Sequence, residues 1–317
     1  MMLDALHRFR GSFAPNGGVN AESGEMQPPP TVFHDQVAVG RHQVDVSLAV
    51  PHPSKRKYNG WALIEPGFGG FMASSEKLML TMAAMGVATA CYEPVRSDHE
   101  NLLFSLIKPQ AIHTDTVAAI SDNLPNNNRL ISEVPEIKAI DLRRLAHLPH
   151  SMGGHPAKEF AENSPNKTDM VVGMAIVGMG SPTIPQLMRN LPAGLPRGIF
   201  MDLLPGIYNG SLDLNIKNAI KVGRYFAQNP FRTAGEAISC LTADFRPAFR
   251  ALGSTGIHTA FVGFGNDSLI NPNPAISEEV DVFTVIPNTG HMAPQVRPHL
   301  VADTVVSVMT NPLMQAA

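Results

Sequence analysis

Short apolar runs that alternate with helical patterns constrain the fold of this chain most strongly. The first run, "GWALIEPG", is nearly continuous in apolar residues, as is typical of a strand buried on both faces of a sheet, and the later runs are also predicted to be strands. The runs occupy residues 60–67, 87–94, 140–151 and 169–180, and helical patterns separate them at 75–86, 109–124 and 152–163. This order predicts an α/β fold, with a doubly wound, mostly parallel sheet and helices on both of its faces.

Further strand-like segments flank this pattern on both sides. Residues 31–40 and 42–51 meet at Gly40 and Arg41, and the second segment alternates apolar with polar residues, so an antiparallel pair is predicted. Late in the chain, two more strands and a closing amphipathic helix are predicted, at 258–267, 281–291 and 295–311. Within the first crossover, Ser74 or Ser75 is expected to cap the helix and Gly86 to end it.

The remaining segments predict the domain organisation. Residues 1–30 are rich in Gly, Pro, Asn and Ser, and we expect a poorly ordered arm there. Residues 182–256 contain helical patterns broken by Pro and Gly, which predicts a helical insertion over one end of the sheet. The α/β core then comprises 31–181 and 257–317. Apolar residues of the insertion, such as Phe231, are expected to pack mainly within the insertion itself.

Composition excludes several classes of function. The chain has 317 residues and a formal net charge of −3, which does not indicate binding to nucleic acid or to an anionic membrane. Its two cysteines, Cys91 and Cys240, lie in apolar surroundings and predict buried free thiols. No apolar run is long enough for a signal peptide or a spanning helix, so we expect a cytoplasmic protein without integral membrane association.

Three polar residues follow separate predicted strands, in the order serine, acid, histidine. Ser151 follows the strand "LRRLAHLPH", Asp267 follows "TAFVGFGN", and His291 follows "VFTVIPNTG". Each residue alone is common in a turn. Ligands of parallel α/β sheets bind beyond the carboxyl ends of the strands, so the three side chains are expected at one site. Asp244, within a helical pattern, is a weaker candidate for the acid.

These motifs resemble those of the α/β-hydrolase family, in which nucleophile, acid and histidine occur in this order. The resemblance covers residues 32–311. "HSMGG" resembles the nucleophile elbow, "GFGNDSLINP" the acid loop, "TGHMAP" the histidine loop and "PGFGG" the oxyanion loop. The helical insertion resembles the cap domain of the family. The resemblance implies the family's fold and a serine hydrolase activity that needs no cofactor.

The resemblance also implies a role for each residue. Ser151 would attack an acyl carbon, His291 would accept and return its proton, and Asp267 would orient the histidine and stabilise its cation. The backbone N–H groups of Met152 and Phe68 would bind the oxyanion, and each such donor typically accelerates the reaction by about 10²–10³. The glycines of the elbow are Gly153 and Gly154, and those of the oxyanion loop are Gly67 and Gly69.

Two prolines depart from the family pattern. Pro149 stands two residues before Ser151, where glycine is usual, and it removes one N–H from the strand. Gly153 is kept, and it is expected to permit the sharp turn. Pro66 replaces the usual histidine of the oxyanion loop. The Pro-Gly-aromatic sequence there and the Asp-x-x-Arg lead-in at 141–144 resemble cutinase-like polyester hydrolases, which lack a large cap.

The other histidines and the glycine-rich loop do not indicate a metal site or a nucleotide site. His147, His150 and His155 surround the serine, but they cross a strand-to-helix turn and would not share one face, so no metal site is expected. His113 and Asp115 are two residues apart on a helix and point in different directions. The glycines of "GFGG" lack the third glycine of a dinucleotide loop and any following Lys-Ser/Thr.

The leading hypothesis is a serine hydrolase of carboxylic esters, similar to esterases and lipases. Its substrate would be a small-molecule or lipid-like ester that enters an apolar pocket beneath the cap. A cutinase-like polyester hydrolase, a thioesterase and an acyltransferase use the same three residues and remain alternatives. So does a relative that binds a ligand without catalysis, which the two prolines favour. The sequence predicts neither the acyl chain length nor the oligomeric state.

Overall fold

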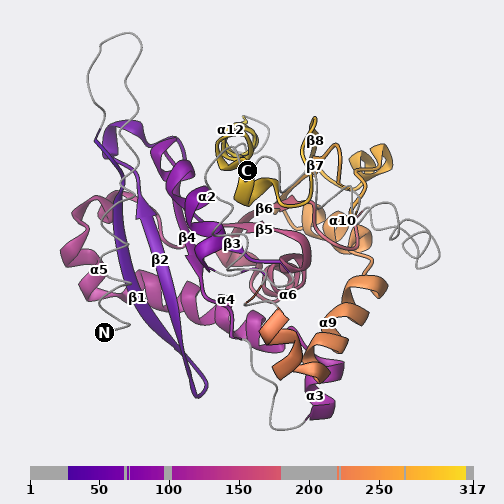
Figure 1. Ribbon diagram of the computed structural model, residues 1–317. Helices are drawn as coiled ribbons and strands as arrows, with labels where there is room; N and C mark the ends of the chain where they lie inside the picture. The colour runs from indigo at the N-terminus through magenta and orange to yellow at the C-terminus, as the bar shows by residue number, and fades with distance from the viewer. Residues whose placement is uncertain are drawn as a thin grey trace.

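The computed structural model describes residues 28–67, 70, 72–95, 102–179, 220, 223–267 and 269–311. Eight strands form one sheet in the order β1-β2-β4-β3-β5-β6-β7-β8 (Figure 1). The strands are β1 (Thr31–Val39), β2 (His42–Val50), β3 (Trp61–Glu65), β4 (Ala88–Tyr92), β5 (Leu145–Pro149), β6 (Thr168–Met174), β7 (His258–Phe264) and β8 (Val282–Ile286). The predicted α/β fold with a mostly parallel sheet is confirmed.

Strands β1 and β2 form the predicted antiparallel hairpin. Their register pairs Thr31 with Val50 and Val39 with His42, and β2 also runs antiparallel to β4. Gly40, in the turn, has a φ of +56°, a backbone conformation that glycine adopts without strain. All pairs from β4 to β8 are parallel, so their carboxyl ends lie along one edge.

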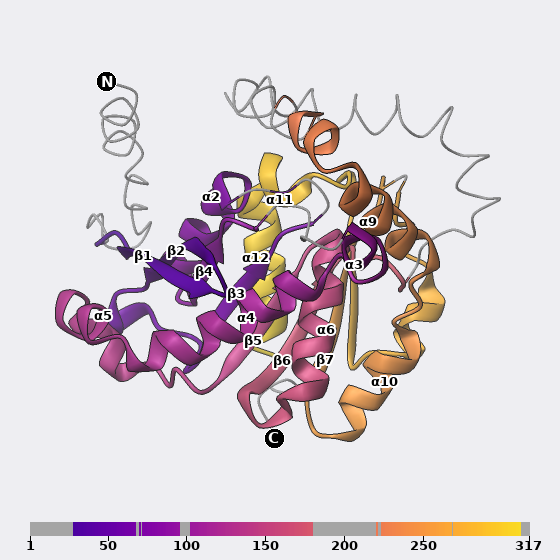
Figure 2. The same ribbon diagram turned by 90° about the horizontal axis from the view of Figure 1, so that it is seen from below.

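Helices cover both faces of the sheet, as Figures 1 and 2 show. On one face α2 packs against α11 and α12, and on the other α6 packs against α4 and α10. The α-helices are α2 (Met72–Ala84), α3 (Leu102–Ile107), α4 (Ala111–Asn123), α5 (Asn128–Glu133), α6 (Gly154–Asn163), α9 (Pro230–Thr242), α10 (Arg246–Ser254), α11 (Ala293–Val296) and α12 (Pro298–Met309). None of the described helices is long and apolar enough to cross a membrane.

Helix α2 begins earlier than the sequence predicts. Ser74 and Ser75 lie inside the helix, and they are buried rather than capping. The N–H of Met72 instead donates to a carboxylate oxygen of Glu93, which follows β4, over 3.0 Å. The predicted cap is therefore wrong, because a residue 21 positions along the chain supplies the acceptor. The predicted end is correct, since Gly86 has a φ of +102°.

The described part of the predicted insertion includes two helices with different surroundings. Helix α10 packs on β7 and α6, and its Phe249 and Leu252 belong to the core of the sheet. We therefore propose that the insertion ends before residue 246 rather than at 256. Residues 182–219 of the predicted insertion lie outside the described residues.

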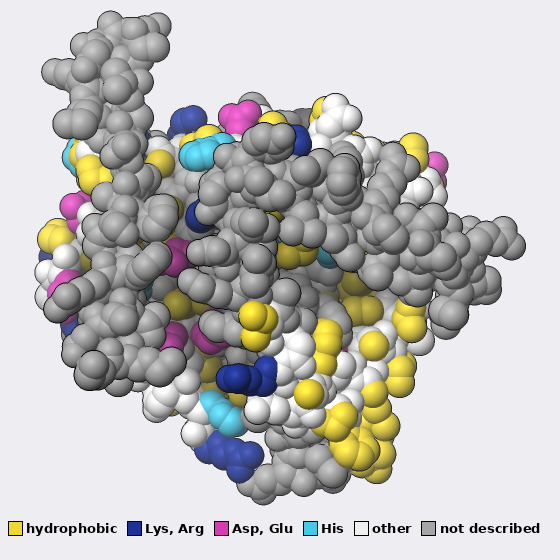
Figure 3. All heavy atoms as spheres, viewed as in Figure 1, with side chains coloured by type: hydrophobic (Ala, Val, Ile, Leu, Met, Phe, Trp, Pro, Cys, Tyr) yellow, Lys and Arg dark blue, Asp and Glu magenta, His cyan; other side chains and the backbone are white. Residues whose placement is uncertain are grey.

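Helix α9 packs against α3 and presents its apolar side chains to solvent. Its buried residues are Arg232, Gly235 and Glu236, and a Cβ on Gly235 would lie 2.5 Å from the Leu106 carbonyl oxygen. Figure 3 shows hydrophobic side chains gathered over the two helices at the lower right. The exposed ones are Leu103, Phe104 and Ile107 of α3 and Phe231, Ile238 and Leu241 of α9. The prediction that Phe231 packs inside the insertion is wrong, because this close helix contact turns its side chain outward.

Candidate active site

The three candidate catalytic residues follow three parallel strands at the carboxyl edge of the sheet. Ser151 comes two residues after β5, Asp267 three residues after β7, and His291 five residues after β8. Strands β5 and β7 are separated by β6 only, and β8 lies beyond β7. The topology therefore brings these residues toward one end of the molecule, where ligands of such sheets bind.

The turn between β5 and α6 has the strained geometry of a nucleophile elbow. Ser151 has a φ of +54°, which is the left-handed region that side chains other than glycine rarely adopt. A single 3₁₀ turn, Ser151–Gly153, leads directly into α6. Such strain typically costs about 1–3 kcal/mol and is concentrated at functional sites.

The two elbow glycines are required by close packing rather than by the turn. Both have negative φ values, −56° for Gly153 and −58° for Gly154, so the conformational reason predicted for Gly153 is wrong. A Cβ on Gly153 would lie 2.3 Å from the Glu65 carbonyl oxygen on β3. One on Gly154 would lie 2.9 Å from the ring of Phe245. Only glycine lets the start of α6 approach the sheet this closely.

Pro149 is accommodated by the way that β5 pairs with its neighbours. The N–H of His150 donates to the Glu65 carbonyl oxygen on β3 over 3.0 Å. Because successive N–H groups of a strand point to opposite sides, the nitrogen of Pro149 faces β6. Continuous pairing with β6 ends at His147, before an isolated bridge between His150 and Met174. The proline therefore lies where regular pairing has already stopped.

Asp267 and His291 form a direct pair. The Nδ1 of His291 lies 2.7 Å from the Oδ2 of Asp267, whose side chain is fully buried. Asp267 Oδ1 accepts from the N–H groups of Leu269 and Ile270, over 2.8 and 2.9 Å. Burial alone would raise the pKa of Asp267, but His291 and the two N–H donors outweigh it and lower the pKa below its ordinary value. The carboxylate is thus ionised, and His291 donates from Nδ1, which leaves Nε2 as its basic nitrogen.

Backbone hydrogen bonds hold the acid and histidine loops together. The N–H of Gly265 donates to the Ile286 carbonyl over 2.9 Å, and the N–H of Asn266 donates to the Thr289 carbonyl over 2.8 Å. In the second loop, Asn288 has a φ of +57°, which Asn tolerates better than most residues. The loops therefore fix the relative position of Asp267 and His291 through their main chains.

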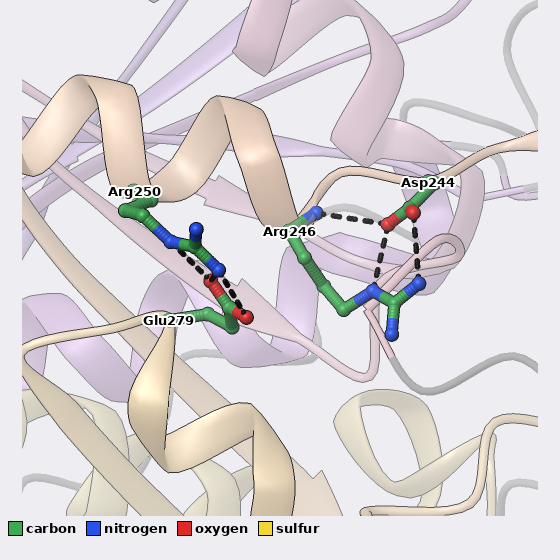
Figure 4. Close-up of polar contacts among 4 residues, drawn as sticks. All are labelled: Asp244, Arg246, Arg250 and Glu279. Atoms are coloured by element: carbon green, nitrogen blue, oxygen red, sulfur yellow. Dashed lines mark hydrogen bonds and ion pairs between the residues drawn. The ribbon is translucent and has the colours of Figure 1, made fainter.

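Asp244, the weaker candidate for the acid, has a different partner. Both of its carboxylate oxygens bind the guanidinium of Arg246 over 2.8 Å, and one also accepts the Arg246 N–H at the start of α10 (Figure 4). These hydrogen bonds to Arg246 outweigh the slight burial of the group and lower the pKa of Asp244. Further along α10, Arg250 forms a second ion pair with Glu279, which lies in the segment between β7 and β8. Asp244 thus binds Arg246 at the N-terminus of α10, whereas Asp267 binds His291.

The structure describes part of the predicted oxyanion site. Met152 is buried and follows Ser151 at the start of the 3₁₀ turn. Gly67 lies against the nucleophile turn, since a Cβ there would be 2.7 Å from the Cβ of Ser151 and 3.0 Å from the His150 carbonyl oxygen. Phe68 and Gly69, the other predicted residues of this loop, lie outside the described residues. The absence of a side chain at Gly67 therefore allows its backbone to approach Ser151.

The hydroxyl of Ser151 makes no hydrogen bond to any residue within the described ranges. Its backbone carbonyl accepts from Val177 over 3.1 Å, so the main chain of the turn is held while the hydroxyl is not. The resemblance implies proton transfer from Ser151 to His291, but this structure has no hydrogen bond between the two side chains. Catalytic hydrogen bonds are often long in free enzymes and tighten when substrate binds.

A buried pair beneath the elbow was not predicted from the sequence. Glu65 of β3 and His147 of β5 are both fully buried, with 2.5 Å between the Oε1 of the acid and the Nδ1 of the ring. The other carboxylate oxygen accepts the N–H of Leu148 over 3.1 Å. Burial raises the pKa of Glu65, which His147 and this N–H counteract only in part. The signal in the sequence is one ionisable residue within each of the apolar segments "WALIE" and "LAHLP", since such residues are rarely buried unless paired.

This pair is expected to contribute strongly to stability. Glu65→Met deprives the buried His147 of its acid, and we expect the free energy of unfolding to fall by about 3 kcal/mol. Adding His147→Leu removes both polar groups and should recover most of that loss. Urea unfolding measures both values. Glu162→Gln breaks the exposed pair with Lys158 and, as the control, should change stability by less than about 0.5 kcal/mol. Losses that simply add in the double variant would contradict the pairing.

No metal centre is found in the described part of the chain, where no three His, Cys, Asp or Glu side chains are arranged to hold an ion. A separate hollow of about 290 Å³ lies between β1, β2, α2 and α5. Its polar side chains bind one another: His34 with Ser47, Gln36 with Asp45, and Asp35 with Arg129. It contains none of the three candidate catalytic residues.

Comparison with known proteins supports the fold alone. No protein-family model matches the sequence, and no curated protein sequence matches it. Solved structures do match. A laboratory-evolved variant of potato epoxide hydrolase has a TM-score of 0.55 at 13% identity, over 88% of this chain and 99% of its own. A bromoperoxidase from Bacillus anthracis has 0.55 at 12% identity, over 90% and 100%. Naproxen esterase from Bacillus subtilis has 0.53 at 12% identity, over 88% and 92%.

The eight-stranded, mostly parallel sheet with helices on both faces agrees with these similarities. The matched structures are members of one superfamily, and each is covered over nearly its whole length. The chain therefore has the α/β-hydrolase fold.

Proposed function

We propose that the protein is a serine hydrolase that cleaves carboxylic esters. The observation that carries the proposal is a strained serine turn and a buried acid–histidine pair at the same edge of the sheet. Ser151 has the backbone of a nucleophile elbow, and His291 is oriented by Asp267 over 2.7 Å. Acyl transfer needs a nucleophile, a base and a group that orients the base, and these three residues supply them.

In the proposed cycle, Ser151 attacks the ester carbonyl while the Nε2 of His291 accepts its proton. The oxyanion is stabilised by the N–H of Met152 and that of Phe68. His291 then donates the proton to the leaving alcohol, which leaves an acyl group on Ser151. Water, deprotonated by His291, releases the acid and restores the free serine. Asp267 stays ionised throughout and stabilises the imidazolium.

The structural neighbours do not decide the reaction. They are named as an epoxide hydrolase, a bromoperoxidase and an esterase, which are three different activities on one fold. Function on a shared fold has to be argued from the site. The serine at the elbow favours ester hydrolysis by an acyl-enzyme route, and we propose a small-molecule or lipid-like ester as substrate.

Cutinase-like polyester hydrolase, thioesterase and acyltransferase activities would use the same residues. Turnover of p-nitrophenyl esters of increasing acyl length would separate short-chain from long-chain preference. Thioesters and an added alcohol acceptor would test the other two reactions.

A fluorophosphonate probe tests the proposal directly. The probe forms a covalent bond with an activated serine, so we expect the folded protein to be labelled at one site, in the peptide that contains Ser151. Mass spectrometry after proteolysis locates the label. Folded protein that stays unlabelled at Ser151 would overturn the proposal and favour a relative that binds a ligand without catalysis.

A further inference from the structure

His150 is a neighbour of both the proposed nucleophile and the proposed base, and the cycle above gives it no role. It directly precedes Ser151 at the end of β5 and is almost completely buried. Its ring centroid lies 4.8 Å from that of His291, with 36° between the ring planes. On another side, the ring of Phe264 from β7 lies 6.3 Å away. The imidazole of His150 thus packs beside the ring of His291.

A hydrogen bond joins the side chain of His150 to the backbone of His291. The Nε2 of His150 lies 2.9 Å from the His291 carbonyl oxygen. A carbonyl oxygen can only accept, so Nε2 carries the proton and donates it. The bond spans 141 positions of the chain and connects the strand of the nucleophile to the loop of the base.

The surroundings of His150 keep it neutral. Burial lowers its pKa to about 3, assisted by the charge of His291 and opposed by the bond to the carbonyl and by Asp267. His150 therefore does not titrate near neutral pH. A neutral ring beside His291 adds no positive charge that would oppose protonation of the base.

The other side of the ring adjoins the oxyanion loop. A Cβ on Gly67 would lie 3.4 Å from the Nδ1 of His150 and 2.7 Å from the Cβ of Ser151. The ring therefore lies close to Gly67, to the nucleophile turn and to the ring of His291. Among these contacts, the hydrogen bond from Nε2–H is the one polar contact between the side chain of His150 and His291.

We propose that His150 is a positioning residue, which holds the main chain of His291 through its Nε2–H and sets the distance between His291 and Ser151. The inference rests on the proposed function, because it concerns the base of that reaction. It predicts that kcat depends more on the Nε2–H donor of His150 than on its aromatic ring. Misplacement of a reacting group by about 1 Å can lower a rate by about 10².

Three variants separate the donor from the ring. His150→Phe keeps a ring and loses the donor, His150→Gln keeps an N–H donor at a similar reach and loses the ring, and His150→Ala loses both. We expect kcat on a p-nitrophenyl ester to fall by about 10²-fold in the Phe and Ala variants, with KM changed less than about threefold. The Gln variant should recover kcat to within about fivefold of wild type. A purely structural role predicts the opposite order, with Phe better than Gln.

The outcomes distinguish this inference from the proposed function. If folded wild type neither reacts with the fluorophosphonate probe nor hydrolyses esters, the proposed function fails. If wild type is active and His150→Phe matches its kcat, or His150→Gln is as slow as His150→Ala, only the positioning role is overturned. Thermal unfolding shows which variants are folded. Should the Phe variant not fold, the comparison of Gln with Ala decides.

Discussion

The Ser151→Ala variant is expected to hydrolyse p-nitrophenyl esters about 10⁵–10⁶ times more slowly than wild type. Without the hydroxyl no acyl-enzyme forms, and only the oxyanion site and substrate binding still contribute. KM should change little, since the substitution removes a single oxygen atom. Because the Ser151 hydroxyl binds no described residue, the melting temperature should also stay nearly the same. Initial rates and thermal unfolding of the purified variant measure the two effects.

The matched control is Ser254→Ala, at an exposed serine whose hydroxyl binds only the Ala251 carbonyl within α10. It should keep full turnover and full labelling by the fluorophosphonate probe. Turnover of Ser151→Ala above about 1% of wild type would mean that another nucleophile carries the reaction.

A second substitution at the same position isolates the strain. Ser151→Gly removes the nucleophile as well, but glycine adopts a φ of +54° without the clash that Ala retains. We therefore expect the Gly variant to be more stable than the Ala variant by about 1 kcal/mol in urea unfolding. Equal stability, or a more stable Ala variant, would contradict the view that this turn stores strain.

Much of the fold could be predicted because burial leaves a clear pattern. Strands buried on both faces need nearly continuous apolar residues, so β3, β4, β5 and β6 stand out in the sequence. Helix α3 and the start of α2 could not be predicted in the same way. The Glu93 carboxylate that accepts from Met72 comes from the end of another strand. Such a cap depends on tertiary structure and leaves no signal near the helix itself.

In the candidate site, too, some features could be predicted from the sequence and others depend on tertiary structure. Ser151, Asp267 and His291 could be singled out because each follows its own strand. Pairs that depend on the register between strands or on the path of a loop could not. Glu65 meets His147 because β3 and β5 lie side by side. His150 meets the His291 carbonyl because the loop after β8 reaches the end of β5. The sequence places a histidine in "LPHSM" but does not show what its ring contacts.

The Asp267→Asn variant is expected to lower kcat by about 10⁴-fold and to leave the fold intact. An amide in place of the carboxylate offers an N–H where the Nδ1–H of His291 now donates over 2.7 Å. His291 then favours the tautomer that carries its proton on Nε2, and that nitrogen can no longer accept the proton of Ser151. The lost charge also removes the stabilisation of the imidazolium.

Asp244→Asn is the matched control, because it makes the same chemical change at the weaker candidate for the catalytic acid. Asp244 binds Arg246 at the start of α10, so its variant should keep wild-type kcat and lose at most about 1 kcal/mol of stability. Steady-state kinetics of the two variants on one ester gives the comparison. The assignment fails if Asp267→Asn retains more than about a tenth of wild-type kcat, since another carboxylate would then orient His291. A loss of kcat in Asp244→Asn alone would identify Asp244 as that carboxylate.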